Sequence, residues 1–96
     1  MKKSLQERKR YISFEVIGNP PDNFEKFIYE EFMKFFGEFG FSKISFKLIE
    51  YNSGRGIVKC KRDYKDKVIG FLSIINTPRI KTIKTSGTLK SLRKQR

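Results

Sequence analysis

The stretch RYISFEVI at residues 10–17 decides the fold, because its side chains alternate between two kinds along the chain. Ile12, Phe14 and Val16 share one side of an extended backbone, while Tyr11 and Glu15 lie on the other. This alternation is typical of a strand with one face in a hydrophobic core. The sequence GNPP at residues 18–21 ends the strand, since two prolines can neither continue a ladder nor enter a helix interior.

A helix with an aromatic face is expected next. Asp22 or Asn23 is expected to cap it, because either side-chain oxygen can accept a backbone N–H of the first turn. Gly37 and Gly40 are expected to end it. Apolar residues recur at three- and four-residue steps, which places them together on a face that belongs in the core: Phe24, Phe27, Ile28, Phe32, Phe35, Phe36 and Phe39.

The apolar surface of this helix is wider than one core face needs. Tyr29, Met33 and Phe36 continue it around one flank. Apolar surface that a small domain cannot bury marks a contact with another molecule. We therefore expect Tyr29, Met33 and Phe36 to form a protein interface.

A β-hairpin is expected over residues 42–61. Residues 42–51 alternate again, with Ile44, Phe46 and Leu48 facing the core. The sequence NSG at residues 52–54 supplies the turn, and residues 55–61 form the returning strand.

A second helix and a fourth strand complete the expected domain. Asp63 is expected to cap the helix, and Gly70 to bring it close to the sheet. Residues 79–85 alternate weakly and form the last strand. The helix has a buried stripe at helical spacing: Tyr64, Val68, Phe71, Leu72 and Ile75.

The order strand, helix, strand, strand, helix, strand predicts an α+β fold of the ferredoxin-like, RNA-recognition-motif-like type. Two right-handed crossovers interleave into a four-stranded antiparallel sheet of order 4-1-3-2, with both helices on one face. Residues 1–9 are expected to be a basic arm, residues 10–85 the sandwich, and residues 86–96 a short basic helix and tail. The other sheet face is expected to display a mixture of cationic and apolar groups: Tyr11, Lys47, Ile49, Tyr51, Ile57, Lys59 and Lys61.

The positive charge is segregated along the chain. The net charge is +12, yet residues 11–53 hold four lysines and seven acidic residues. Residues 54–96 hold thirteen basic and two acidic residues. Such asymmetry points to a polyanion, most often nucleic acid. A membrane surface fits less well, because the basic C-terminal stretch offers only Leu89 and Leu92 as an apolar face.

The C-terminal stretch TSGTLKSLR at residues 85–93 has the features of a positioned helix. Ser86 or Thr88 can cap it and Gly87 allows a sharp turn before it. Leu89 and Leu92 would pack inward, which leaves the neighbouring cations for phosphates.

Catalysis by the polypeptide itself is not expected. The chain has no histidine and one cysteine, Cys60, whose position in a strand predicts a buried, inert thiol. Glu30 and Glu31 are adjacent and diverge on a helix, so a bound metal is not expected. Arg55 and Gly56 open a strand as in RNA-recognition motifs, but the following outward positions lack stacking aromatics, which favours readout of phosphates and RNA shape. No apolar secretory or membrane segment is present, and a cytoplasmic location is expected.

Five stretches resemble archaeal ribonuclease P protein component 2. They are KRYISFEV at 9–16, FFGEFG at 35–40, LIEY at 48–51, GIVKC at 56–60 and TSGTLKSLR at 85–93. The resemblance implies a subunit of the ribonucleoprotein that removes the 5′ leader from precursor tRNA, an endoribonuclease whose RNA carries out the chemistry with Mg²⁺. The subunit would bind and stabilise that RNA, meet precursor tRNA only indirectly, and pair with component 3 in a two-plus-two heterotetramer.

The cations expected to contact RNA lie at both ends and in the second half of the chain: Lys9, Arg10, Arg55, Lys59, Lys61, Arg62, Lys84, Lys90, Arg93 and Lys94. Two alternatives stay open on the sequence. One is a small ribosomal or other structural RNA-binding protein of the same fold. The other is a protein-interaction module whose charge serves solubility.

Overall fold

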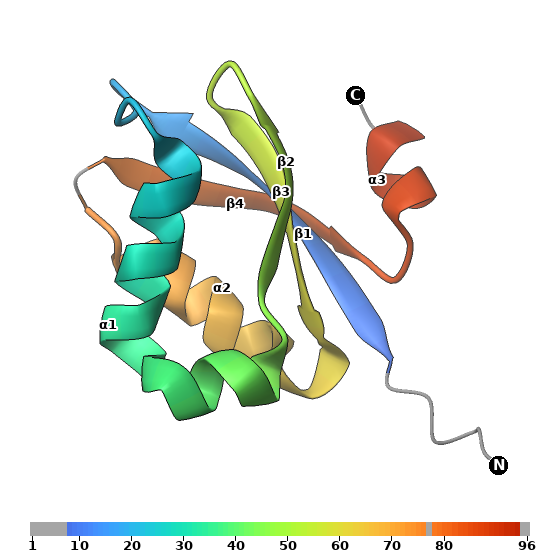
Figure 1. The fold of residues 1–96 in the computed structure, drawn as a ribbon. Coiled ribbons are helices and arrows are strands. Elements are labelled where there is room, and N and C mark those ends of the chain that lie inside the picture. The colour runs from blue at the N-terminus through green and yellow to red at the C-terminus, as the bar shows by residue number, and fades with distance from the viewer. Residues whose placement is uncertain (1–7, 77, 95–96) are drawn as a thin grey trace, which may run out of the picture.

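The structure, a computed structural model, describes residues 8–76 and 78–94 and has the predicted order of elements (Figure 1). The strands are β1 (Lys9–Ile17), β2 (Lys47–Asn52), β3 (Arg55–Lys61) and β4 (Arg79–Ser86). The helices are α1 (Phe24–Ile44), the 3₁₀ turn η2 (Arg62–Tyr64), α2 (Lys65–Ile74) and α3 (Leu89–Lys94). All strand pairs are antiparallel in the order β2-β3-β1-β4, which confirms the predicted sheet. Helices α1 and α2 cover one face, and α3 lies on the other (Figure 1).

Aromatic side chains fill the core between the sheet and the two long helices. The Phe32 and Phe46 rings stack with centroids 4.2 Å apart, and Phe71 of α2 meets Phe32 edge-on at 5.3 Å. Ile12, Phe14 and Val16 of β1 are buried on this face, as their alternation predicts.

Helix α1 begins as predicted and ends later. Asn23 is its cap and accepts a hydrogen bond from the Lys26 backbone at 3.1 Å. Gly37 has a φ of +78° and kinks the helix, but the helix resumes and continues to Ile44. The predicted end at Gly37 and Gly40 is therefore wrong, as is the strand assignment of residues 42–46. Packing overrides the local pattern, because the second segment buries Ile44 against the same core.

A bulge at Ile49 reverses the alternation of β2. Leu48 pairs with Val58, whereas Glu50 pairs with Ile57, so one residue is left over. Tyr51 consequently faces the helices and stacks on Phe24 at 4.3 Å. The prediction that Tyr51 lies on the outer face is wrong.

A second bulge interrupts the pairing of β1 with β4. Phe14 pairs with Thr82 and Ser13 with Lys84, which leaves Ile83 unpaired. The Ser13 hydroxyl spans the irregularity, since it accepts from the Lys84 N–H at 3.1 Å and lies 3.3 Å from the Lys84 carbonyl oxygen, to which it donates.

Two details of the second helix differ from expectation. Asp63 lies within η2, and the residue preceding α2 is Tyr64, which makes no side-chain cap. Gly70 is exposed and an added Cβ would meet nothing within 4 Å, so it does not bring the helix close to the sheet. The predicted buried stripe is confirmed for Val68, Phe71, Leu72 and Ile75, and Tyr64 is partly buried.

Candidate nucleic-acid interface

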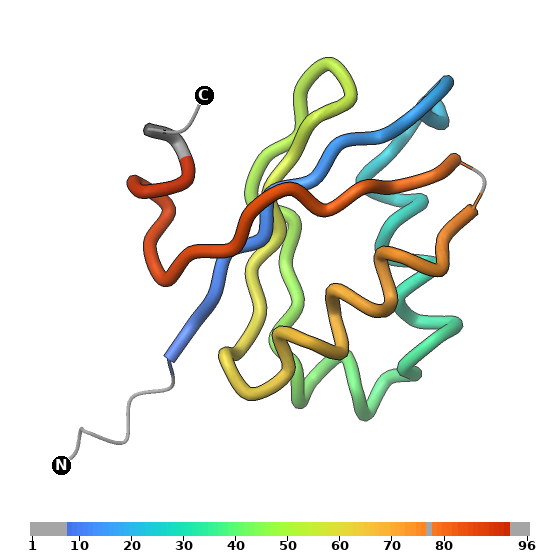
Figure 2. The backbone as a smooth tube through the Cα atoms, turned by 180° about the vertical axis from the view of Figure 1, so that it is seen from behind, coloured from blue at the N-terminus to red at the C-terminus, as the bar shows by residue number. Residues whose placement is uncertain are grey.

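Helix α3 packs on the sheet face opposite to α1 and α2. Figure 2 shows β4 running directly into it on that side of the molecule. The Thr88 hydroxyl oxygen accepts from the Ser91 N–H at 3.2 Å, which caps the helix. Leu92 is only 3% exposed, and so is Ile57 of β3. The outer sheet face thus carries a small apolar contact of its own, and Ile57 is not displayed to solvent as expected.

A glycine at position 87 allows the chain to pass close to the Arg10 side chain, and is not needed for a left-handed backbone conformation. Its φ is not in the left-handed region, but an added Cβ would lie 3.3 Å from Arg10 Nη1. The Arg10 guanidinium also donates to the Lys9 carbonyl oxygen at 2.9 Å. Arg10 therefore lies at the joint between the first strand and the C-terminal helix.

Three lysines from three strands meet near the start of β1. Lys59 pairs in register with Tyr11 on one side and with Lys47 on the other. Burial lowers the pKa of Lys59, and the charges of Lys9 and Lys47 lower it further. We call Lys9, Lys47 and Lys59 the lysine cluster. Within residues 8–76 and 78–94, none of the three forms a salt bridge.

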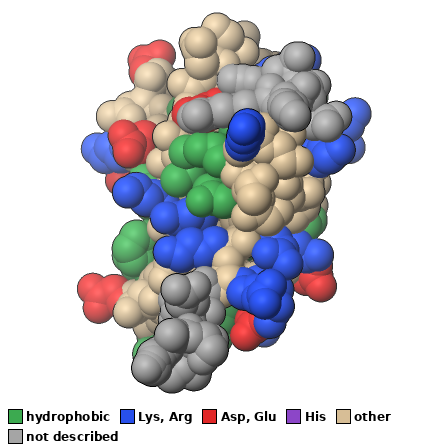
Figure 3. All heavy atoms as spheres, turned by 90° about the vertical axis from the view of Figure 1, so that its right-hand side faces the viewer, with side chains coloured by type: hydrophobic (Ala, Val, Ile, Leu, Met, Phe, Trp, Pro, Cys, Tyr) green, Lys and Arg blue, Asp and Glu red, His purple; other side chains and the backbone are tan. Residues whose placement is uncertain are grey.

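The lysine cluster concentrates positive charge on the outer sheet face. The charges of Lys9 and Lys47 repel that of Lys59 in the folded protein, and an anion placed near them would reduce this repulsion. Figure 3 looks onto this side of the molecule and shows Lys and Arg side chains around and below a central hydrophobic patch. Lys47 was placed on this face by its alternation but was not among the expected RNA contacts. Its cross-strand register with Lys59 is the signal that identifies it.

The other expected RNA contacts fall into separate groups. Lys61 pairs in register with Lys9, and the Arg62 N–H donates to the Arg8 carbonyl oxygen at 2.8 Å, so both lie beside the lysine cluster. Arg55 and Lys84 lie farther along the sheet, where both line one pocket. Lys90 is exposed on α3. Arg93 and Lys94 belong to the last turn of α3, and their side chains lie outside the described part of the structure. Most of the expected arm, residues 1–7, also lies outside it.

The expected protein interface divides between the interior and the surface. The Tyr29 hydroxyl accepts from the Leu48 N–H at 2.8 Å and so ties α1 to β2. Phe36 is half-buried against Phe32. Met33 is 38% exposed. Tyr29 therefore has a structural task within the domain.

Other apolar side chains of the two long helices are more exposed. Phe35 and Phe39, which were expected in the core, are 53% and 77% exposed, so that prediction is wrong for these two residues. Phe35 and Ile74 line one depression between α1 and α2. We call Met33, Phe35, Phe39 and Ile74 the exposed apolar surface.

The one cysteine of the chain is buried in β3. Burial raises the pKa of the Cys60 thiol to about 11, so it stays protonated and a poor nucleophile at neutral pH. In the described residues, no three His, Cys, Asp or Glu side chains gather where they could hold a metal ion. No helix in that part of the chain is both long and apolar enough to cross a membrane.

Comparison with known proteins agrees with this description. Ribonuclease P protein component 2 of Pyrococcus horikoshii is 30% identical, and the alignment covers 96% of this chain and 85% of that protein. The Archaeoglobus fulgidus protein of the same name is 31% identical over 96% of this chain and 91% of its own length. The Methanococcus maripaludis protein of that name is 34% identical, and the alignment covers 83% of this chain and 64% of that protein. A sequence model of the Rpp14/Pop5 family matches residues 10–96, and the chain therefore belongs to that family, which confirms the resemblance seen in its sequence.

Proposed function

We propose that this chain is a ribonuclease P subunit that binds and stabilises the catalytic RNA of the enzyme. The observation that carries the proposal is the lysine cluster, in which Lys9, Lys47 and Lys59 lie close together without a neutralising carboxylate among the described residues. Membership of the family supplies the complex in which such a site would act.

The role of the lysine cluster is neutralisation of crowded phosphates. A folded RNA brings phosphates together at an electrostatic cost that bound cations reduce. Lysines fixed on the sheet supply part of that positive charge and, unlike dissolved cations, do not exchange with the solvent. The polypeptide thereby lowers the amount of Mg²⁺ that the RNA needs, while the RNA retains the chemistry of leader removal and the contact with precursor tRNA.

The helical side of the domain is free for a protein partner. The exposed apolar surface lies on α1 and α2, on the opposite side of the sheet from the lysine cluster and α3. One molecule can therefore hold RNA and protein at the same time. We propose that component 3 occupies this side, within a two-plus-two assembly.

Salt dependence of RNA binding tests the proposal. The slope of log affinity against log salt concentration is negative, and each phosphate contact contributes roughly −0.9 to it. The variant Lys9→Gln/Lys47→Gln/Lys59→Gln should therefore make this slope shallower by about two to three units. The matched control is Lys26→Gln/Lys43→Gln/Lys67→Gln, which removes the same charge from exposed positions on α1 and α2. Equal slopes for the two variants would contradict the assignment of the RNA site.

The choice of RNA separates the two RNA-binding hypotheses. Ribonuclease P RNA should bind more tightly than a ribosomal RNA fragment of equal length at the same salt concentration. Equal affinity would favour a general structural RNA-binding protein.

A further inference from the structure

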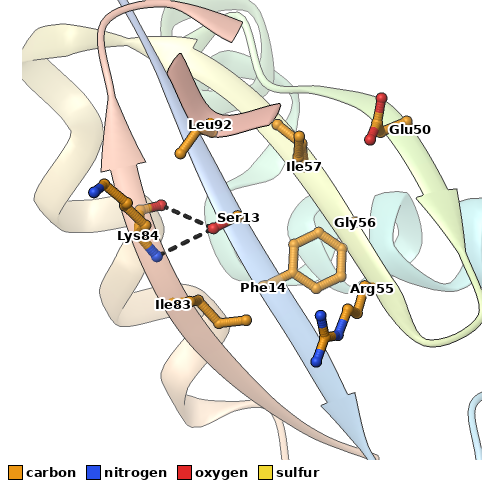
Figure 4. Close-up of a pocket in the computed structure, with 9 residues that line it drawn as sticks. All are labelled: Ser13, Phe14, Glu50, Arg55, Gly56, Ile57, Ile83, Lys84 and Leu92. Atoms are coloured by element: carbon orange, nitrogen blue, oxygen red, sulfur yellow. Dashed lines mark hydrogen bonds between the residues drawn. The ribbon is translucent and has the colours of Figure 1, made fainter. Parts of the chain in front are cut away.

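A pocket of about 240 Å³ opens on the outer sheet face between α3 and the β2–β3 hairpin (Figure 4). It lies apart from the lysine cluster, none of whose members lines it. Its walls come from all four strands and from α3: Ser13, Phe14, Glu50, Arg55, Gly56, Ile57, Ile83, Lys84 and Leu92.

Three aliphatic side chains, Ile57, Ile83 and Leu92, line this pocket. Ile57, Ile83 and Leu92 surround the position of Ser13 in Figure 4 and come from β3, β4 and α3. Ile57 and Leu92 are buried, whereas Ile83, the unpaired residue of the bulge in β4, is 54% exposed. A large apolar side chain is thus held at the mouth of a cavity, where a flat apolar ligand would cover it.

The rim of the pocket carries charge of the sign that a phosphate needs. Arg55 and Lys84 lie on different sides of it, on β3 and β4. The Arg55 guanidinium is 3.9 Å from the Glu15 carboxylate, a long and largely exposed ion pair that contributes little. Glu50 also lines the rim, so a group with one phosphate fits better than a polyphosphate.

We infer that this pocket receives the base of one unpaired nucleotide of the bound RNA, with its phosphate beside Lys84 or Arg55. The inference rests on the proposed RNA-binding function. The sheet lacks the aromatic residues on which RNA-recognition motifs stack bases. The pocket offers a different means, in which an aliphatic cavity buries the base. Its volume lies below the roughly 300–1,000 Å³ of sites for larger ligands, which matches a single ring system.

Methyl NMR of the full chain tests the inference directly. Adenosine, guanosine, cytidine and uridine 5′-monophosphates are added separately, with ribose 5-phosphate as the control that lacks a base. At least one nucleotide should shift the Ile57, Ile83 and Leu92 methyl signals, with weak affinity, and ribose 5-phosphate should not. Equal shifts with ribose 5-phosphate would reduce the site to a phosphate contact. Unchanged signals at high nucleotide concentration would also overturn the inference.

A matched pair of variants links the signals to the pocket. Ile83→Ala should lower nucleotide affinity by about three- to tenfold, since it removes apolar surface that the base would cover. Ile74→Ala is the control, because Ile74 is 59% exposed on the helical side of the molecule. Both positions are exposed, so both variants should keep the fold. Equal affinity in the two variants would contradict the placement of the base.

The phosphate contact has its own test. Lys84→Gln should weaken adenosine 5′-monophosphate binding and leave adenosine binding unchanged. An equal loss for both ligands would contradict a contact between Lys84 and the phosphate.

Failure of the pocket and failure of RNA binding give different results. If only the pocket inference fails, ribonuclease P RNA still binds the wild-type chain and Ile83→Ala equally well. If the proposed function fails, that RNA binds neither protein specifically. An acetylated leucine amide that shifts the three methyl signals when nucleotides do not would assign the pocket to a protein side chain and overturn the inference.

Discussion

Gly56 in β3 has no room for a side chain. An added Cβ would lie 2.6 Å from Phe14 Cζ and 2.7 Å from the Glu50 carbonyl oxygen, neither of which can move freely. Gly56→Ala should therefore lower the free energy of unfolding by about 1–3 kcal/mol, as overpacked cores do. Chemical denaturation measures this loss.

Gly70 provides the opposite comparison on the same fold. It lies within α2, and an added Cβ would meet nothing within 4 Å. Gly70→Ala should raise the free energy of unfolding by about 0.5–1 kcal/mol, because alanine loses less conformational freedom in a helix. A destabilised Gly70→Ala protein, or an unaffected Gly56→Ala protein, would contradict the packing described for α2 or β3.

Lys59 should show a conflict between stability and binding. Its pKa lies below the ordinary value of 10.5, chiefly through burial and then through Lys9 and Lys47, so its charge is disfavoured in the folded protein. Lys59→Gln should raise the melting temperature at low salt. It should also make the negative slope of log RNA affinity against log salt concentration shallower by about one unit. Lys67→Gln, an exposed lysine on α2, is the control and should do neither.

The lowered pKa of Lys59 also predicts how the stability of the protein changes with pH. Between the lowered pKa and 10.5 the unfolded chain binds more protons than the folded chain, so stability rises with pH in this window. At neutral pH, below this window, the charge of Lys59 destabilises the folded protein to its full extent. Lys59→Gln should lack this rise of stability with pH. Melting temperatures of the two proteins measured across alkaline pH check the prediction.

Helix α3 depends on its contact with the sheet. It has six residues, too few for a stable isolated helix, and Leu92 is its buried residue. Leu92→Ala should therefore raise the hydrogen-exchange rates of the α3 amides and leave β1 and β3 protected. Leu89→Ala, at a partly exposed position, is the control. Protection of α3 that survives Leu92→Ala would contradict this seating.

The element order and core could be predicted from the sequence because periodicity reports which face is buried. The alternation of Ile12, Phe14 and Val16 and the stripe of α2 identified the buried faces, and the order of the elements with right-handed crossovers then predicted the sheet order. The bulges could not be predicted. A single extra residue at Ile49 places Tyr51 on the helical face, and nothing in the local pattern marks that residue.

The site could be predicted only in outline. Charge segregation pointed to the cationic ends and the second half of the chain, and strand alternation placed Lys47, Lys59 and Lys61 on the outer sheet face. It could not show that Lys47 joins Lys9 and Lys59, because that contact depends on the register of three strands. It also could not show that Leu92 of α3 and Ile57 of β3 line one pocket, since the two residues are far apart in the sequence.

The molecule as a whole separates two kinds of surface. The outer sheet face carries the lysine cluster, the pocket and α3, while the helical side carries the exposed apolar surface. A domain of this form can join an RNA to a protein without competition between them. The proposed function rests on this arrangement, with RNA expected on the outer sheet face and a protein partner on the helical side.

The Mg²⁺ dependence of precursor tRNA cleavage tests this account most directly. Ribonuclease P RNA is assembled with component 3 and with the wild-type chain, the triple lysine-cluster variant or no chain, and leader removal is followed across Mg²⁺ concentrations. The account predicts that the wild-type chain supports cleavage at lower Mg²⁺ than the RNA needs without it, and that the variant loses most of this advantage. Identical Mg²⁺ dependence with and without the chain would contradict it.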